Sequence, residues 1–482
     1  MTATLLVELF CEELPPKALE RLGTAFADGI HAGLKKRGML EGTAQHHTFA
    51  TPRRLAVSLP GVKKASDPRA TELKLMPVSV GLDASGNPTP ALLKKLEAAG
   101  LAGFDPAKLK KRVDGKAEML FADATIPATT LAQALQGALE DALAHLPIPK
   151  VMAYQLADGE TTVQFVRPAH GLVALHGSEV VAVSVLGLKA DRITHGHRFQ
   201  GAANITLAKA EDYEGKLKDE GRVIADFAAR RSEVSRQLLE KAAGIAPGFK
   251  PDAELLDEVT ALVEWPAVYV GTFNEEFLSV PQECLILTMQ KNQKYFPLAG
   301  ADGKLLSKFL IVSNMQLDDP LNIVQGNERV VRPRLADARF FFETDRKTRL
   351  SDRVEQLGSM TYHNKLGTQL ERVERLRKLA SRIQVMLPRG EKGRPYADRA
   401  AFLAKADLVT LMVGEFPELQ GVMGKYYAEA DGEEPSVVRA IEQHYLPRFS
   451  GDALPTGDTS IAVALADRLD ALVGMFSIGL IP

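Results

Sequence analysis

The sequence predicts an α+β multidomain fold, in which a mixed α/β portion is followed by an all-α portion. A length of 482 residues is sufficient for several domains with separate cores. Valine-rich runs bounded by glycine and proline, which are typical of strands, are frequent up to about residue 325. After about residue 328, helical periodicity takes over and strand signals nearly vanish. We therefore expect an N-terminal α/β region at 1–155, a β-rich α/β region at 156–327 and an all-helical region at 328–482.

The first region carries signals for both strands and helices. The apolar run LLVELF at 5–10 predicts a short buried strand, and RRLAVSLPG at 53–61 predicts another. Apolar residues at helical spacing predict a helix within 16–38, with the glycine at its end as a stop signal. Leucines at four-residue spacing from Leu131 to Leu143 predict a second amphipathic helix.

The second region is dominated by strand signals. A charged stretch at 219–244 has helical character and interrupts them. The valine-rich runs that predict strands are 161–177, 179–193, 266–278 and 308–315.

The segment VVRPRLADARFFFETDRK at 330–347 opens the helical region and concentrates basic residues. Pro333 stands at a plausible first helical position. Four apolar residues after it fall on one stripe of a helix: Leu335, Ala338, Phe341 and Phe342. Arg334 and Arg346 lie off that stripe, so we expect the aromatic residues to be core. The arginines could contact a nucleic acid, another domain or only solvent.

Composition and termini limit the class of protein. The net charge is −2, so a nucleic acid would have to be held by local basic patches. Cys11 and Cys284 form neither a disulfide framework nor a zinc motif. The N-terminus lacks a basic leader, and no apolar run approaches the roughly 20 residues of a membrane span. We expect a cytoplasmic protein without a signal peptide. Because the sequence stops just after the apolar run VGMFSIGLIP, we also expect it to have been cut from a longer chain.

Two short basic motifs are the clearest candidates for binding. The chain has no P-loop, no dinucleotide fingerprint and no nucleophile elbow. The motif ITHGHRFQG contains His195, His197 and Arg198; two histidines at i and i+2 of a strand would suit a metal, but a third ligand is missing. A basic turn that contacts phosphate or a partner subunit, or a solvated loop, are the other interpretations. Arg53 and Arg54 in TPRRLAV could fork onto phosphates, or only begin a solvated strand.

The helical region contains a weaker constellation of metal-ligating residue types. His363, Asp407 and Asp467, with Asp470 nearby in sequence, resemble the ligands that hold a divalent metal for phosphate-ester hydrolysis. Such a site normally has a histidine directly before the middle aspartate, where this chain has Ala406. We therefore expect no metal here. A metal-dependent phosphohydrolase of the HD type is kept as the alternative function.

Taken together, the ordered motifs resemble the beta subunit of the bacterial two-subunit glycyl-tRNA synthetase, over essentially the whole chain. The matching motifs, in order, are LLVELFCEELPPKAL, TPRRLAV, GNPTPA, FVRPAHGLVAL, THGHRF, WPAVYVGTFNEEFLSVPQECLILTMQKNQKYF, GNERVVRPRLADARFFFETDRK, YHNKLGT and GEFPELQGVMGKYYA.

The resemblance implies a non-catalytic but essential subunit of glycine–tRNA ligase. Such a subunit assembles with alpha subunits, commonly two of each, and positions tRNA for glycine. The alpha subunit uses ATP and Mg²⁺ to form glycyl-adenylate, so no catalytic residue and no cofactor is expected in this chain. The resemblance also implies a degenerate HD-type domain and a C-terminal anticodon-binding domain, which this sequence lacks. The candidate tRNA contacts are Arg53, Arg54, His195, His197, Arg198, Arg329, Arg332, Arg334 and Arg339.

Two motifs depart from the family pattern. Ala153 and Tyr154 replace the usual Arg-Trp pair, and Gly171 stands where the family usually has tryptophan. Both departures fall in the α/β portion, and we assign no family role to that surface.

Overall fold

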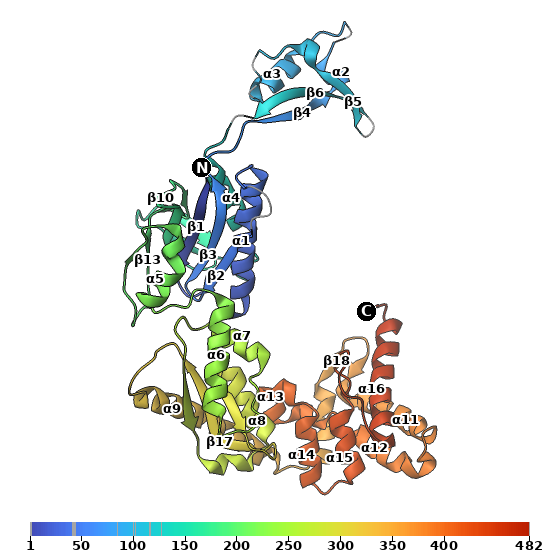
Figure 1. Ribbon diagram of the computed structural model, residues 1–482. Helices are drawn as coiled ribbons and strands as arrows, with labels where there is room; N and C mark the ends of the chain where they lie inside the picture. Colours follow the sequence, from blue (N-terminus) through green and yellow to red (C-terminus); the bar gives the residue numbers. More distant parts are fainter. Residues whose placement is uncertain are drawn as a thin grey trace. The chain divides into compact units, whose positions relative to one another are not determined.

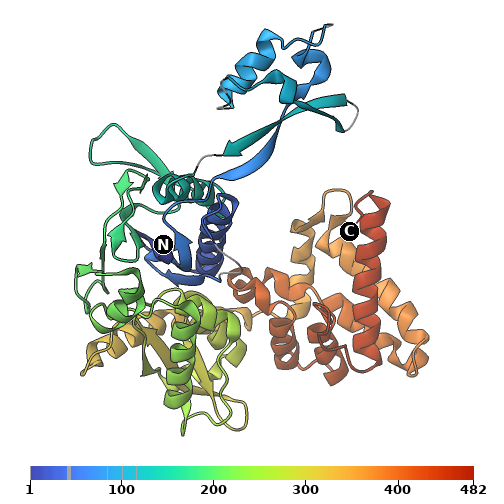
Figure 2. The same cartoon turned by 45° about the horizontal axis from the view of Figure 1, so that its top comes forward.

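The computed structural model describes residues 2–40, 45–83, 85–99, 101, 103–114, 117–126 and 128–481. The chain divides into two compact units (Figures 1 and 2). The first unit contains residues 1–234 and 256–266, and the second contains 235–255 and 267–482. Mixed α/β structure precedes an almost entirely helical C-terminal part, as the sequence predicted.

The first unit is built on an antiparallel sheet with the strand order β10-β9-β1-β3-β2. Residues of β1 alternate between two cores because successive side chains of a strand point to opposite faces. Leu5, Val7 and Leu9 pack under α1 and α4, whereas Leu6 faces a second core. The strands of this sheet are β1 Thr2–Cys11, β2 His47–Thr51, β3 Arg54–Lys63, β9 Ala169–His176 and β10 Glu179–Val180.

The two long helices of the first unit pack closely on one face of that sheet. They are α1 Leu19–Lys36 and α4 Leu131–Ala144. A side chain at Gly33 would stand 2.6 Å from Cβ of Ala138, so glycine is required for this approach. Thr130 and Gln133 form a capping box at the start of α4. Both helices that the sequence predicted are confirmed.

The opposite face of the sheet is covered by short elements that follow β9 in the chain. Their core includes Ile205, Tyr213 and Leu217. The remaining elements of this part are β7 Met152–Gln155, β8 Thr162–Phe165, β11 Ser184–Val185, β12 Leu188–Lys189, β13 Ile193–Thr194, β14 Ile205–Thr206, α5 Tyr213–Asp219, α6 Phe227–Ala242 and α7 Ala253–Thr260. The chain passes between the two units three times: within α6, within α7 and directly before Ala267.

A small sheet with its own core is inserted between β3 and α4. Its strands have the order β4-β6-β5, and Leu75, Leu92 and Leu120 lie at the centre of its core. Its elements are β4 Arg69–Pro77, α2 Val78–Gly81, α3 Pro90–Ala98, β5 Lys110–Asp114 and β6 Ala117–Ile126.

The second unit joins a three-stranded sheet to the C-terminal helices through one continuous core, which extends from Phe277 to Ala466. The predicted boundary at 327–328 therefore marks a change of secondary structure within that core. The division into three regions stays a prediction. The sheet, of order β15-β17-β16, consists of β15 Ala267–Thr272, β16 Phe296–Ala299 and β17 Leu305–Ser313.

In the helical part of the second unit, α11 packs against α12 and α16, and α15 also packs against α12 and α16 (Figure 1). Among the described residues, no helix is both long and apolar enough to cross a membrane. The elements are α8 Gln282–Leu287, α9 Leu321–Asp345, α10 Leu350–Arg353, β18 Thr361–His363, β19 Gly367–Thr368, α11 Gln369–Val385, α12 Arg394–Leu403, α13 Leu411–Glu415, α14 Val422–Ala430, α15 Pro435–Gln443 and α16 Asp458–Ser477.

The segment 330–347 lies mostly in α9, but that helix begins earlier than the sequence predicted. Pro333 is inside α9 and not at its first position. The apolar stripe is confirmed, because Leu335, Ala338 and Phe342 are buried in the core. Phe340 corrects the expectation for the aromatic residues, since 61% of it is exposed.

Candidate nucleic-acid interface

In the first unit, the two basic motifs meet although about 140 residues separate them in sequence. They meet around Phe10, near the end of β1. The Arg53 guanidinium lies 4.6 Å from the centre of the Phe10 ring, and the His195 ring lies 4.7 Å from it. The Nη2 atom of Arg54 donates a hydrogen bond of 2.7 Å to the backbone oxygen of His195. We call Phe10, Arg53, His195 and Arg198 the Phe10 patch.

Arg54 anchors this arrangement from inside the protein. Its side chain is fully buried, 3.7 Å from Glu8 and 3.5 Å from Glu264. Burial lowers the pKa of Arg54, but the charges of Glu264 and Glu8 outweigh that effect and raise its pKa. Arg54 therefore has no atom to offer a tRNA phosphate, and we withdraw it as a contact.

The two carboxylates beside Arg54 are held by further buried donors. Glu8 accepts hydrogen bonds from the hydroxyl of Thr194 at 2.7 Å and from that of Tyr213 at 2.5 Å. Glu264 accepts one from the hydroxyl of Thr51 at 2.8 Å. A buried charge is tolerated only when it is paired and hydrogen-bonded, so this network fixes the strand ends beneath the Phe10 patch.

His197 also has a structural position. It is 1% exposed, and its Nδ1 atom accepts hydrogen bonds from the backbone amides of Phe199 and Gln200. It shapes the turn that exposes Arg198 and Phe199, and it is not accessible to tRNA. Within the described residues, no group of three histidine, cysteine or acidic residues is arranged to hold a metal ion.

Two acidic residues border the Phe10 patch and partly neutralise it. Arg198 contacts Glu12 at 2.9 Å and Glu13 at 3.4 Å. His170 Nε2 also lies 3.1 Å from Glu12. Burial raises the pKa of Glu12, but hydrogen bonds, including one from Arg198, hold it below its usual value. A phosphate would therefore compete with Glu12 for Arg198.

The departures from the family pattern lie beside this patch. Gly171 pairs with Phe10 across β1 and β9, and a Cβ atom at Gly171 would lie 3.8 Å from Nε2 of His195. The hydroxyl of Tyr154 accepts a hydrogen bond from the Ala169 amide at 3.2 Å. The surface that most resembles a binding patch thus also contains the positions at which the sequence analysis expected departures from the family pattern.

In the second unit, α9 presents the other candidate arginines. Arg329, Arg332 and Arg334 are exposed, and the last two make no ion pair with any residue that the structure describes. Arg339 differs, because Glu276 at 2.9 Å and Glu343 at 2.7 Å hold its guanidinium. Hydrogen bonds to Glu343 and Glu276 raise the pKa of Arg339. Exposed Phe340 on this helix is an aromatic ring on which a base could stack.

Asp467 and Asp470 belong to a buried charged cluster among α11, α15, α16 and the turn at 404–410. The ammonium of Lys405 lies 3.0 Å from Asp467 and 4.0 Å from the centre of the Tyr445 ring. Arg372 contacts Asp467 at 3.0 Å and Asp470 at 3.2 Å. We call Arg372, Lys405, His444, Asp467 and Asp470 the Lys405 cluster.

Burial acts in opposite directions on the pKa values of the bases Lys405 and His444 and of the acids Asp407 and Asp467. It lowers the pKa of Lys405 to about 8 and that of His444 to about 3. It raises the pKa of Asp407 to about 6, although the amides of Gly421 and Gly424 donate hydrogen bonds to that carboxyl. For Asp467 burial acts in the same direction, but Lys405, His444 and Arg372 hold its pKa below the usual value.

This geometry does not fit a divalent metal. Asp407 and Asp467 are both close enough to Lys405 for their charges to act on it, but an ammonium already pairs with Asp467. His363 is on β18, where its Nδ1 atom accepts a hydrogen bond from the Lys365 amide. Of the described residues, neither aspartate contacts His363 through a hydrogen bond or ion pair. The predicted triad is therefore only partly assembled.

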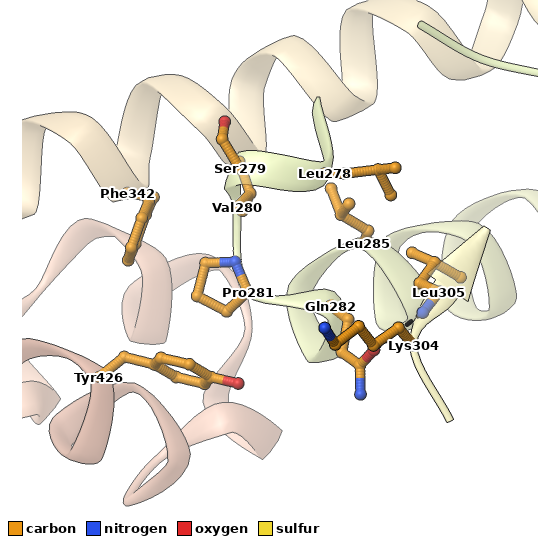
Figure 3. Close-up of a pocket in the computed structure, with 10 residues that line it drawn as sticks. All are labelled: Leu278, Ser279, Val280, Pro281, Gln282, Leu285, Lys304, Leu305, Phe342 and Tyr426. Carbon is orange, nitrogen blue, oxygen red and sulfur yellow. Dashed lines mark hydrogen bonds between the residues drawn. The ribbon is translucent and has the colours of Figure 1, made fainter. Parts of the chain in front are cut away.

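One open cavity of the second unit, of about 520 Å³, lies outside these clusters. In Figure 3, Phe342 and Tyr426 lie on one side of Pro281, and Lys304 lies with Leu305 on the other. Lys304 is the one charged residue of its ten lining residues. Without converging polar groups, the cavity has no chemistry that selects a ligand.

Comparison with known proteins decides the family. The family described as "Glycyl-tRNA synthetase beta subunit" matches residues 5–482. The chain belongs to this family. Three similar curated proteins are each named glycine–tRNA ligase beta subunit. That of Acidovorax sp. (strain JS42) is 56% identical over 99% of this chain and 69% of its own length. Those of Delftia acidovorans and Aromatoleum aromaticum are both 57% identical over 100% of this chain, and over 69% and 68% of their own lengths.

Membership of the glycyl-tRNA synthetase beta subunit family confirms the resemblance that the motifs indicated. Nothing in the comparisons supports the alternative phosphohydrolase, and the ammonium beside Asp467 speaks against it.

Several residues that organise these two sites were not predicted from the sequence. Glu8 had a signal, because a lone carboxylate inside an apolar strand run requires a buried partner. Lys405 also had a signal in the sequence, because it directly precedes Ala406, which stands where a metal-binding histidine was expected. Phe10 and His444 had no distinctive signal, because nothing in the spacing showed which cationic groups they would meet.

Proposed function

We propose that this chain is the tRNA-binding beta subunit of glycine–tRNA ligase. It binds tRNA for glycine and positions it, while the alpha subunit forms glycyl-adenylate from ATP and glycine and charges the tRNA. The observation that carries this proposal is the family match over residues 5–482, with relatives more than half identical over the whole chain.

The contribution of the chain to the reaction is positional. Phosphate contacts orient a nucleic acid, and holding the acceptor end in place converts an encounter between two molecules into an effectively unimolecular step. ATP and Mg²⁺ act in the alpha subunit, so this chain supplies no catalytic residue and holds no cofactor of its own. We further propose a cytoplasmic heterotetramer of two alpha and two beta subunits.

Fewer residues are available as tRNA contacts than the sequence suggested. Arg53, His195 and Arg198 of the Phe10 patch have exposed or half-buried side chains. On α9 the available cations are Arg329, Arg332 and Arg334, with Phe340 as a stacking ring. Arg339 is a weaker candidate, because it would first have to leave Glu276 and Glu343.

For the helical region we propose a degenerate HD-type domain. This proposal is supported by Asp407 and Asp467, which both lie close enough to Lys405 for their charges to act on its ammonium. The domain is then a folded support and not a hydrolase.

A tRNA titration tests the main proposal. Labelled tRNA for glycine should bind the chain, and log affinity should fall linearly with log salt concentration. A tRNA for another amino acid is the control for specificity, and charging activity should appear only when the alpha subunit is added. A salt slope near zero, or no binding with or without the alpha subunit, would contradict the proposal and favour a purely structural subunit.

A further inference from the structure

A polar cavity of about 460 Å³ in the second unit brings together the N-termini of two helices. They are those of α15 and α16, with Arg389 and Arg439 among the lining residues. None of the tRNA candidates and no member of the Lys405 cluster lines it.

The first backbone amides of α16 are available as hydrogen-bond donors. This helix has 20 residues, and no side chain caps its first turn, which follows Gly457. The first amides of a helix have no partner within the helix, and the helix dipole places partial positive charge there. The N-terminus of α15 differs, because the Glu434 side chain accepts a hydrogen bond from the Ser436 amide.

A buried hydroxyl independently indicates a missing ligand. Thr459 lines the cavity and is 2% exposed, and its Oγ1 atom has no hydrogen-bond partner among the described residues. An unpaired buried hydroxyl is unfavourable, so such a group usually has a partner. An acceptor that enters the cavity would provide one.

Two guanidinium groups complete the set of donors. Arg389 and Arg439 are exposed, and neither forms an ion pair with any residue in the described part of the chain. Arg389 lies over the Tyr396 ring, with its guanidinium carbon 5.5 Å from the ring centre. Arginine offers a planar fork of donors that matches the oxygen atoms of a phosphate.

The cavity also contains two carboxylates, and both are already engaged. Asp458 accepts a hydrogen bond from the Arg389 amide at 2.6 Å, and Glu434 accepts one from the Ser436 amide at 2.7 Å. Their charges weaken anion binding. A ligand that accepts several strong hydrogen bonds is therefore favoured over a ligand that is held by charge attraction alone.

We propose that this cavity binds a phosphate group, held by Arg389, Arg439, the Thr459 hydroxyl and the first amides of α16. Helix N-termini with adjacent arginines are established phosphate-binding chemistry. The phosphate belongs either to an RNA backbone, which rests on the proposed function, or to a free phosphate or nucleotide.

The first experiment uses inorganic phosphate as the probe and the full chain. Phosphate should raise the melting temperature of the wild type more than chloride does at equal ionic strength. The double substitution Arg389→Gln/Arg439→Gln should weaken the apparent phosphate affinity at least tenfold. Arg382→Gln, an exposed arginine of α11 outside the cavity, is the matched control and should have no effect.

Thr459→Val gives a second measurement that does not depend on charge. The hydroxyl has no protein partner, so the variant should fold with unchanged stability but bind phosphate several-fold more weakly. Equal phosphate responses of the wild type, Thr459→Val and the double variant would overturn the proposal.

The second experiment identifies the source of the phosphate. If the RNA backbone supplies it, Arg439→Gln should weaken binding of tRNA for glycine and reduce the salt slope by about one. Loss of phosphate binding with unchanged tRNA affinity would assign the site to a free phosphate or nucleotide. If the wild type binds no tRNA, the proposed function fails, while the phosphate titration still decides the site.

Discussion

Together with their direct neighbours Glu12 and Tyr445, the Phe10 patch and the Lys405 cluster combine the same kinds of residue but differ in exposure. In each, a cation lies over an aromatic ring, Arg53 over Phe10 and Lys405 over Tyr445. In the patch, the side chain of Arg198 is 44% exposed and that of Glu12 is 36% exposed. In the cluster, the corresponding values are 3% for Lys405 and 14% for Asp467.

This difference in exposure separates residues that are available for binding from residues that stabilise the fold. An exposed ion pair contributes little to stability and can exchange its acid for a phosphate. A buried pair cannot, because removal of one partner leaves an uncompensated charge in a medium of low polarity. Burial therefore decides which arginines and lysines are available to RNA. Changes to the buried cluster should affect folding, and changes to the exposed patch should affect binding.

The largest effect is expected from Asp467→Ala, which leaves both Lys405 and Arg372 short of a partner. We expect a loss of about 3–5 kcal/mol in the free energy of unfolding, measured by urea denaturation. The double variant Asp467→Ala/Lys405→Met should recover part of the loss, because it removes the unpaired ammonium as well. A loss no larger than that of an exposed pair would contradict the structural role of the cluster.

Neighbouring arginines of the first unit give the next test. Arg54→Met removes the buried cation that lies 3.7 Å from Glu8 and 3.5 Å from Glu264, and should destabilise the chain by about 3 kcal/mol. Arg53→Gln should change stability by less than about 0.5 kcal/mol but weaken tRNA binding several-fold. If the two variants gave the same ratio of stability loss to affinity loss, burial would not separate their roles.

His444 makes stability depend on pH. Its folded pKa of about 3 lies below the unfolded value, so the unfolded chain binds the proton first and stability is lost as the pH falls from 6.5 toward 3. Between pH 6.5 and 5.5 this loss should be about 1 kcal/mol. His444→Gln should lack it. The contribution of Asp407, whose raised pKa of about 6 acts in the opposite direction, is present in both proteins and cancels in their difference.

The smallest effect is expected from Glu12→Gln, which removes the acid that competes with phosphate for Arg198. Affinity for tRNA should rise about twofold at low salt and be unchanged at high salt, because screening already weakens an exposed pair. The double variant Glu12→Gln/Arg198→Gln should lose this gain. An affinity gain that persists at high salt would point to a contact other than charge.

The apolar periodicity of the sequence predicted reliably which positions are buried. It was less informative about the roles of the buried side chains. The strand at 5–10 and the helix from Leu131 are confirmed, because apolar spacing reports directly on the face that meets a core. Helix α3 was not predicted, although Thr89 caps it and Pro90 begins it. Pro333 was misplaced because a proline can also stand inside an exposed turn of a long helix.

Site residues were harder to predict, for a physical reason. Arg53 and Arg54 are adjacent in sequence, but only the packing of β1 and β3 shows that one is fully buried and the other is not. Likewise, Ala406 indicated the loss of a metal ligand, but the pairing of Lys405 with Asp467 joins two segments that are distant in sequence. The partner of a buried charge is a property of the tertiary fold.

The ammonium of Lys405 has a consequence for how the folded subunit is produced. A metal ion has to be acquired after synthesis, and a domain built around one depends on metal supply and is sensitive to chelators. Lys405 is part of the chain from its synthesis, and its ion pair with Asp467 forms as the core folds. A side chain of the protein itself thus completes this part of the interior, and no separately acquired group has to fill the space beside Asp467.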